Sequence, residues 1–182
     1  MRKNYFSNTL KMLLTIVFSC VFMSVWAQSE IHVEKAGTLP SLLPTSENTL
    51  KITGSINGTD VKHLRKLISE GSVNSLDLSG VRIVKGGSAY DGTNKTEDDI
   101  IGPTMFKNFT NLRSVELPAT ITAIRSQAFA ATGLKKVDIP NTVSTLEDHV
   151  FADCSFLNTV VIGRRVSRMH QGVFYNSPVK TA

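Results

Sequence analysis

Cysteine is scarce in this sequence. Only two cysteines occur among 182 residues, Cys20 and Cys154, and the first lies inside an N-terminal apolar run. If that run is removed after synthesis, one cysteine remains and no internal disulfide can form. The stability of the mature chain must then come from its hydrophobic core. We expect Cys154 to be a small buried side chain of that core rather than a nucleophile.

Motifs of enzymes and metal sites are also missing. The sequence contains no G-x-S-x-G elbow, no H-E-x-x-H helix and no Gly-rich phosphate loop. No pair of ligands has H-x-x-x-H or C-x-x-C spacing. The histidines are His32, His63, His149 and His170. The sequence therefore predicts no catalytic residue, no metal site and no cofactor.

The first 27 residues have the pattern of a secretory signal peptide. A basic start with Arg2 and Lys3 precedes an apolar run over residues 12–26. Val25-Trp26-Ala27 supplies small residues at the positions that a signal peptidase reads. We predict cleavage after Ala27, and therefore export to the periplasm, the cell surface or the medium.

Two alternatives to a cleaved signal involve the membrane. A spanning anchor needs roughly 20 apolar residues, and the run over residues 12–26 is shorter. A lipid anchor at Cys20 requires a small residue where bulky Phe18 stands, and the apolar run continues past the cysteine instead of becoming polar. We therefore expect a signal peptide, and no transmembrane segment after its removal.

The mature chain lacks a strong excess of charge of either sign. Removing residues 1–27 takes away three basic residues and no acidic residue, so the formal net charge falls from +5 to +2. This balance carries no general signature of nucleic-acid binding. With 41% hydrophobic residues, the sequence is long and apolar enough for one domain with a sizeable core.

The sequence contains an internal repeat. The segment VDIPNTVSTLEDHVF over residues 137–151 has two relatives in register, over residues 115–129 and 160–174. A phenylalanine closes each copy and another precedes them, so the series Phe106, Phe129, Phe151 and Phe174 has spacings of 23, 22 and 23 residues. A fixed period in the low twenties predicts a solenoid, in which each turn buries its apolar residues against the next.

Within one copy, the apolar spacing predicts the path of the chain. Val137 and Ile139 alternate as a short strand, and a corner follows at Pro140. Val143 and Leu146 then face inward from a second segment. We interpret these residues as core. The matching columns are Leu112, Leu134 and Leu157; Val115, Val137 and Val160; Leu117, Ile139 and Ile162; Ile121, Val143 and Val166; and Ile124, Leu146 and Met169.

These copies resemble the bacterial BspA-like leucine-rich repeats, whose unit is similar to L-x-x-[IV]-x-[IL]-P-x-x-[VI]-x-x-[IL]-x-x-x-[AV]-F-x-x-C-x-x-L. The residues that carry the resemblance are Leu134, Val137, Ile139, Pro140, Val143, Leu146, Val150, Phe151, Cys154 and Leu157. It extends over about residues 105–177. Gly163 replaces the proline of the motif, and Thr132 and Phe109 lie near its cysteine position.

The resemblance implies both a fold and a class of function. The implied fold is an α/β repeat solenoid, a right-handed and strand-rich leucine-rich-repeat coil over residues 105–182. The implied function is binding to macromolecules at the surface of a host or bacterial cell, and some relatives act as adhesins.

Residues 50–104 predict a cap followed by an insertion loop. A strand over residues 50–54 and a helix from Thr59 or Asp60 to about Glu70 form an atypical first turn. This stretch is similar to the N-terminal cap of the same family. The polar residues 28–48, which Pro40 and Pro44 interrupt, predict a linker or a loosely packed segment that leads into the domain.

The insertion over residues 85–105 is rich in Gly, Asp, Asn and Thr. Its acidic residues Glu97, Asp98 and Asp99 could supply oxygens to a calcium ion. The spaced D-x-D-x-D-G loop and the distal glutamate of such a site are missing, so we expect a solvated acidic loop.

Side chains that flank the inward residues of each strand form the candidate binding surface. They are Ser114, Glu116, Lys136, Asp138, Thr159 and Val161. Arg164, Arg165 and Arg168 add a basic patch near the last turn. This basic patch is either a solvated face or a site for an acidic glycan or protein.

The sequence thus predicts an exported, non-enzymatic interaction module. Its expected partner is a protein or glycan on a host or bacterial surface, and not a nucleic acid. The alternative is a truncated or partner-completed structural fragment of a longer repeat array with no ligand of its own. The last turn motivates this alternative, because we expect Leu157, Ile162 and Val166 to be exposed there and to favour self-association through the C-terminal edge.

Overall fold

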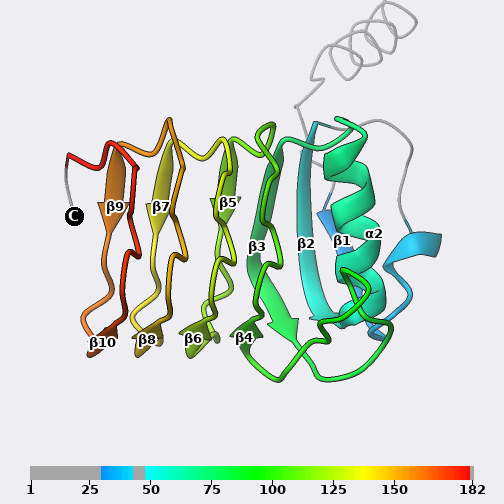
Figure 1. Ribbon diagram of the computed structural model, residues 1–182. Helices are drawn as coiled ribbons and strands as arrows, with labels where there is room; N and C mark the ends of the chain where they lie inside the picture. Colours follow the sequence, from blue (N-terminus) through cyan, green and yellow to red (C-terminus); the bar gives the residue numbers. More distant parts are fainter. Residues whose placement is uncertain (1–29, 43–47, 181–182) are drawn as a thin grey trace, which may run out of the picture.

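The computed structural model describes residues 30–42 and 48–180. The predicted signal peptide over residues 1–27, with its cleavage site and Cys20, lies outside the described residues. Parallel strands stack along one axis in two walls (Figure 1). The first wall contains a four-stranded sheet of β1 (Glu30–Val33), β2 (Thr49–Ile56), β3 (Ser75–Ile83) and β5 (Ser114–Glu116). A two-stranded sheet of β7 (Lys136–Asp138) and β9 (Thr159–Val161) continues the same wall (Figure 1). The second contains β4 (Ile100–Ile101), β6 (Ala123–Ile124), β8 (Thr145–Leu146) and β10 (Arg168–Met169).

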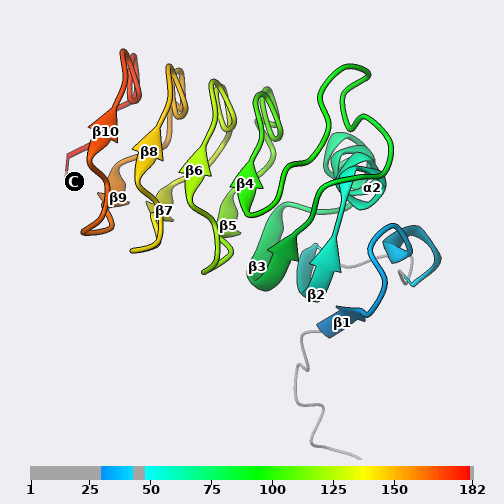
Figure 2. The ribbon, with the colours of Figure 1, turned by 90° about the horizontal axis from the view of Figure 1, so that it is seen from below.

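A third set of backbone hydrogen bonds joins the far corners of successive turns, where no regular strand forms. The N–H groups of Phe106, Phe129 and Phe151 donate to carbonyl oxygens of the next turn at 2.7, 2.9 and 2.8 Å. The stacked rings of these phenylalanines and of Phe174 have centroid separations of 5.3, 5.4 and 5.8 Å. Turns of nearly constant length therefore lie side by side, as Figure 2 shows from below.

The apolar columns predicted from the repeat form the core. Most of their members are buried, including Leu134, Val137, Val143 and Leu146. The last turn differs, because Met169 is 48% exposed although its column faces inward in the other turns.

The expected exposure of the last turn is correct only in part. Leu157 is fully buried, so that prediction is wrong. Ile162 and Val166 are partly buried and pack against the core. Leu157 is covered because the chain returns beside it, where the Lys180 N–H donates to the Asn158 carbonyl oxygen at 3.0 Å.

The predicted linker is folded wherever the structure describes it. Strand β1 pairs in parallel with β2, and Ile31 and Val33 enter the core. A short 3₁₀ helix, η1 (Leu39–Ser41), then buries Leu39 completely. Because this segment places apolar side chains in the core, residues 30–42 are part of the domain rather than a flexible connection.

The predicted helix is α2 (Gly58–Ser69), which begins earlier than expected. Its N-cap is Asn57, and not Thr59 or Asp60, because the Asn57 side chain accepts a hydrogen bond from the Thr59 N–H at 2.9 Å. Asp60 occupies the third helical position and completes a capping box. The helix buries Val61, Leu64 and Ile68 and lies beside β1 and β2 at one end of the stack (Figure 1).

The expectation of a solvated acidic loop after β3 is correct for Glu97 and Asp98, which are exposed, but other parts of the insertion are buried. Tyr90 and Thr96 are buried, and the Tyr90 hydroxyl donates to the Pro103 carbonyl oxygen at 2.8 Å. Strand β4 lies inside this segment and begins the second wall. Gly87 has a φ of 70° and contacts the start of α2 so closely that a Cβ would lie 2.4 Å from the Asn57 side-chain oxygen. The insertion therefore closes against the helix.

Candidate binding surface

The six predicted strand residues form two rows across β5, β7 and β9. In the register of β7 and β9, Lys136 lies opposite Thr159 and Asp138 lies opposite Val161. Ser114 and Glu116 occupy the same positions on β5, which lies beside β7 (Figure 1). Ser114 and Thr159 are half-buried, and the other four are exposed. The structure thus brings all six onto one face of the first wall.

The same row continues beyond the residues that sequence reasoning identified. Glu116 pairs in register with Asp77 on β3, and Asp77 with Lys51 on β2. The signal for Asp77 was present, because Leu76-Asp77-Leu78 has the same pattern as Val115-Glu116-Leu117. The surface is therefore longer than the repeats alone.

Exposed ion pairs occupy part of this face. The Lys136 ammonium lies 2.8 Å from the Asp138 carboxylate, and Lys51 lies 2.8 Å from Glu30. The hydrogen bond from Lys136 to Asp138 raises the pKa of the lysine. Because both pairs lie at the solvent-accessible surface, these contacts contribute little to stability and can yield to a partner.

A shallow hollow crosses the ends of β5, β7 and β9 and the corners that follow them. Its lining residues are Glu116, Leu117, Ala119, Asp138, Ile139, Pro140, Asn141, Val161, Ile162, Gly163 and Arg164, and we call it the corner groove. Val161 is 50% exposed at its edge. A Cβ on Gly163 would lie 2.3 Å from the Pro140 carbonyl oxygen, so the close approach of these two turns explains why glycine replaces the proline of the motif.

The predicted basic patch lies at the last turn. Arg164, Arg165 and Arg168 are all exposed. Arg164 borders the corner groove, and its backbone N–H donates to the Asn141 side-chain oxygen at 2.9 Å. Arg168 begins β10 on the second wall. Of the three, only Arg164 therefore lines the groove.

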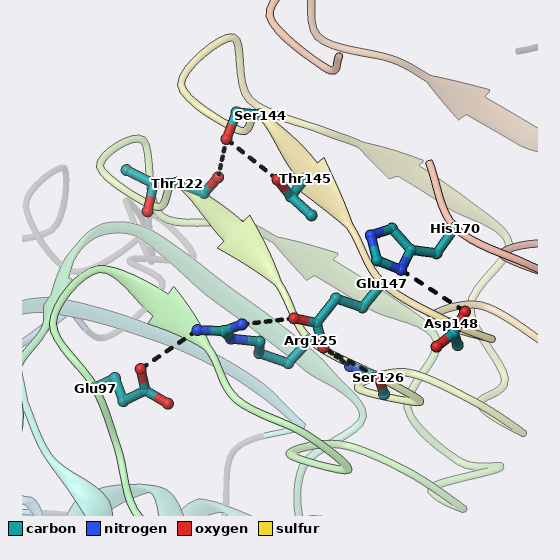
Figure 3. A network of polar contacts seen from close by, with 9 residues as sticks. All are labelled: Glu97, Thr122, Arg125, Ser126, Ser144, Thr145, Glu147, Asp148 and His170. Carbon is teal, nitrogen blue, oxygen red and sulfur yellow. Dashed lines mark hydrogen bonds and ion pairs between the residues drawn. The ribbon is translucent and has the colours of Figure 1, made fainter. Parts of the chain in front are cut away.

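Sequence reasoning missed a polar network on the second wall (Figure 3). Arg125 lies between two carboxylates, 2.6 Å from Glu147 and 3.5 Å from Glu97. Glu147 also accepts hydrogen bonds from the backbone and hydroxyl of Ser126, both at 3.0 Å. The network connects three successive segments, which indicates that it holds the turns together.

Opposing effects determine the pKa of Glu147. Partial burial alone would raise it, but the hydrogen bonds from Arg125 and Ser126 together hold it below its ordinary value. The same hydrogen bond between Arg125 and Glu147 raises the pKa of Arg125, because it stabilises the charged form of both groups. Both groups are therefore charged at neutral pH.

Metal and thiol chemistry find no support in the described ranges. No cluster of three or more His, Cys, Asp or Glu side chains in residues 30–42 and 48–180 is placed to hold a metal ion. The three acidic residues of the insertion already have partners within the protein. Glu97 pairs with Arg125, and Asp98 accepts a hydrogen bond from the Lys85 N–H. Asp99 pairs with Arg82 and accepts a hydrogen bond from the Thr120 hydroxyl. Cys154 is buried as predicted, and burial raises the pKa of its thiol.

Comparison with known proteins identifies the repeat. The model of the BspA type leucine rich repeat region matches residues 94–182 in six copies. Among solved structures, a leucine-rich repeat protein from Bacteroides ovatus is 21% identical, with a TM-score of 0.45, over 81% of this chain and 37% of its own. The chain therefore spans little more than a third of that protein's length. No curated protein matches the sequence.

In residues 30–42 and 48–180, no helix has both the length and the apolar character that crossing a bilayer requires.

Proposed function

We propose that this chain, whose residues 94–182 match the model of the BspA type leucine rich repeat region, is an exported interaction module without enzymatic activity. The family supports a protein-interaction role, and the fold with parallel strands and few helices agrees with it. We further propose that the turns form a solenoid that α2 and β1 cap at its N-terminal end.

The observation that carries this proposal is the face formed by β5, β7 and β9. Its inward residues are fixed by the core, whereas the outward rows mix charged, polar and apolar side chains beside the corner groove. Successive turns repeat these positions at the strand spacing of about 4.8 Å. A partner can therefore contact several turns at once, and its affinity adds over many weak contacts.

The export part of the proposal depends on the N-terminal segment. A basic start, an apolar run and small residues at Val25 and Ala27 support a cleaved signal peptide. Together with the repeat family, this supports a role in adhesion to proteins or glycans at a cell surface, in the periplasm or in the medium.

A binding screen tests the function. Purified residues 28–182 are applied to arrays of surface proteins and glycans, together with a Glu116→Arg, Val161→Asp variant of the face. A matched variant with two reversals on α2, Lys62→Glu and Lys66→Glu, is the control. We expect at least one ligand that the face variant loses and the control retains. If both variants bind every ligand as the wild type does, the face is not the binding surface.

A second candidate function follows from the last turn. Ile162 and Val166 are only partly covered, and Met169 is 48% exposed. A structural subunit that another set of turns completes would bury these side chains. Association that removes Met169 from solvent would favour this candidate over a self-sufficient binding module.

A further inference from the structure

Three arginines of the last turn differ from the other arginines in the described ranges. Arg65, Arg82, Arg113 and Arg125 each contact carbonyl oxygens, a carboxylate or an aromatic ring. No described residue forms a side-chain hydrogen bond, an ion pair or a ring contact with the guanidinium group of Arg164, Arg165 or Arg168. Their donors are therefore available to a partner.

The turn that carries these three arginines has no acidic side chain. Residues 154–180 include four Lys and Arg residues and no Asp or Glu. The acidic groups of the corner groove, Glu116 and Asp138, lie on the two preceding turns, and Asp138 already pairs with Lys136 at 2.8 Å. The groove is thus acidic at its β5 end and basic at its β9 end.

The aliphatic lining of the corner groove favours an acidic protein segment over an anionic glycan. Leu117 and Ile139 line it but are only 5% and 3% exposed. Its accessible aliphatic surface is Val161, which is 50% exposed beside Arg164, together with the partly buried Ile162. An anionic glycan would satisfy the arginines but would leave this aliphatic surface without an apolar side chain to cover it. A protein segment supplies both kinds of group, because carboxylates match the guanidinium fork and an aliphatic side chain can pack on Val161.

We propose that the corner groove binds a protein segment in which acidic residues lie on one side of an aliphatic residue. The aliphatic side chain covers Val161, and a carboxylate pairs with Arg164 in the groove. Arg165, the next residue along the chain, lies outside the groove lining and adds positive charge beside it. This assignment rests on the proposed function, since it specifies the partner of the same face. It also sets a direction, with the acidic part of the partner toward the last turn.

Titration by NMR with short peptides tests the proposal, because weak binding still shifts amide resonances. The probes are Glu-Glu-Val-Gly-Gly, its lysine counterpart Lys-Lys-Val-Gly-Gly, and the serine peptide Glu-Glu-Ser-Gly-Gly, each added to residues 28–182 at low salt. We expect the first peptide to shift Val161, Ile162, Arg164 and Arg165, the serine peptide to bind more weakly, and the lysine peptide to leave these resonances unchanged.

A charge-reversal variant provides the direct check. Arg164→Glu with Arg165→Glu should reduce the affinity for the acidic valine peptide at least about tenfold, since each reversal places like charges together. The control Lys62→Glu with Lys66→Glu on α2 should bind as the wild type does. The spectra themselves show whether each variant is folded.

The possible results separate this proposal from the broader one. Equal binding of the acidic peptide by the Arg164→Glu, Arg165→Glu variant overturns it. Binding of the lysine peptide at the same resonances also overturns it, but leaves the face as a protein-binding surface. Shifts produced by a sulfated disaccharide and by none of the peptides contradict a protein partner. If no probe shifts the resonances of the groove residues, this proposal fails. The proposed binding function is then still tested separately by the array screen.

Discussion

At the scale of single residues, Asp60 determines how the N-terminal segment is attached. Its buried carboxylate accepts hydrogen bonds from the backbone N–H groups of Gly37, Leu39 and Asn57. The first two belong to residues 30–42 and the third to the start of α2. One side chain thus fixes the helix and the segment that precedes it.

Replacing Asp60 by Ala should be strongly destabilising. The substitution leaves three backbone donors without their acceptor, so we expect the free energy of unfolding to fall by about 2–4 kcal/mol. Urea denaturation followed by circular dichroism measures the change. Glu70→Gln, at an exposed position near the end of the same helix, should change stability by less than about 0.5 kcal/mol. Equal effects of the two substitutions would contradict the role of Asp60.

The second residue-scale prediction concerns Glu147 and pH. Its folded-state pKa lies below the ordinary value of 4.5, so its contribution is complete above pH 4.5 and is lost as the pH falls through the folded pKa. Glu147→Gln should therefore cost about 0.5–1 kcal/mol near pH 7, and the difference from wild type should shrink toward pH 3. Urea midpoints at both pH values measure it, and a pH-independent difference would refute the ionic contribution.

At the scale of elements, each turn contains a residue with left-handed backbone at the same corner. These residues are Asn108, Ala131, Asp153 and Asn176, with φ of 68°, 55°, 58° and 52°. Asn and Asp adopt this conformation more readily than other non-glycine residues. Ala131 is therefore the least suited member of the column.

The substitution Ala131→Asn should stabilise the chain. We expect a gain of roughly 0.5–1 kcal/mol, because the new residue tolerates the left-handed backbone better. Thermal unfolding measures it. The control is Ala119→Asn, at an exposed corner position without positive φ, which should give no gain. A lower unfolding temperature for Ala131→Asn would contradict the claim that the left-handed backbone at this position costs stability.

The phenylalanine stack gives a second prediction at this scale. Phe129 is completely buried between two rings, whereas Phe174 is only partly buried at the end of the stack. Phe129→Ala should cost about 3–5 kcal/mol, and Phe174→Ala less than half as much. Denaturant midpoints compare them. Similar losses at both positions would mean that stacking between turns is not the main contribution of these phenylalanines to the free energy of unfolding.

The repeated elements could be predicted from the sequence, but the elements joined by long-range contacts could not. The strand, corner and core positions of each turn follow from apolar spacing, which is a local property. Residues 30–42 appeared to be a linker because their anchor, Asp60, is 21 residues from Leu39. Strand β4 was hidden because it has only two residues within a polar insertion.

The candidate surface follows the same division. The six residues on β5, β7 and β9 could be predicted because a strand alternates its faces. The contacts of Arg125 with Glu97 and Glu147 depend on side-chain geometry between turns, and no spacing in the sequence indicates them. The corner groove also needed the structure, since it lies where three corners meet.

At the scale of the whole molecule, the charge of the last turn opposes pairing of two copies through that end. Residues 154–180 contain no acidic residue, so two such turns facing each other would place cations together. We therefore expect residues 28–182 to remain monomeric across a tenfold concentration range in light scattering. Concentration-dependent association would instead favour the partner-completed subunit.

The central claim is that a partner binds across β5, β7 and β9. Hydrogen–deuterium exchange of residues 28–182, with and without the tightest ligand from the array screen, tests it most directly. We expect bound ligand to slow exchange in these strands and in the corners of the groove at residues 117–119, 139–141 and 162–165. Protection confined to β4, β6, β8 and β10, or to α2, would contradict the account.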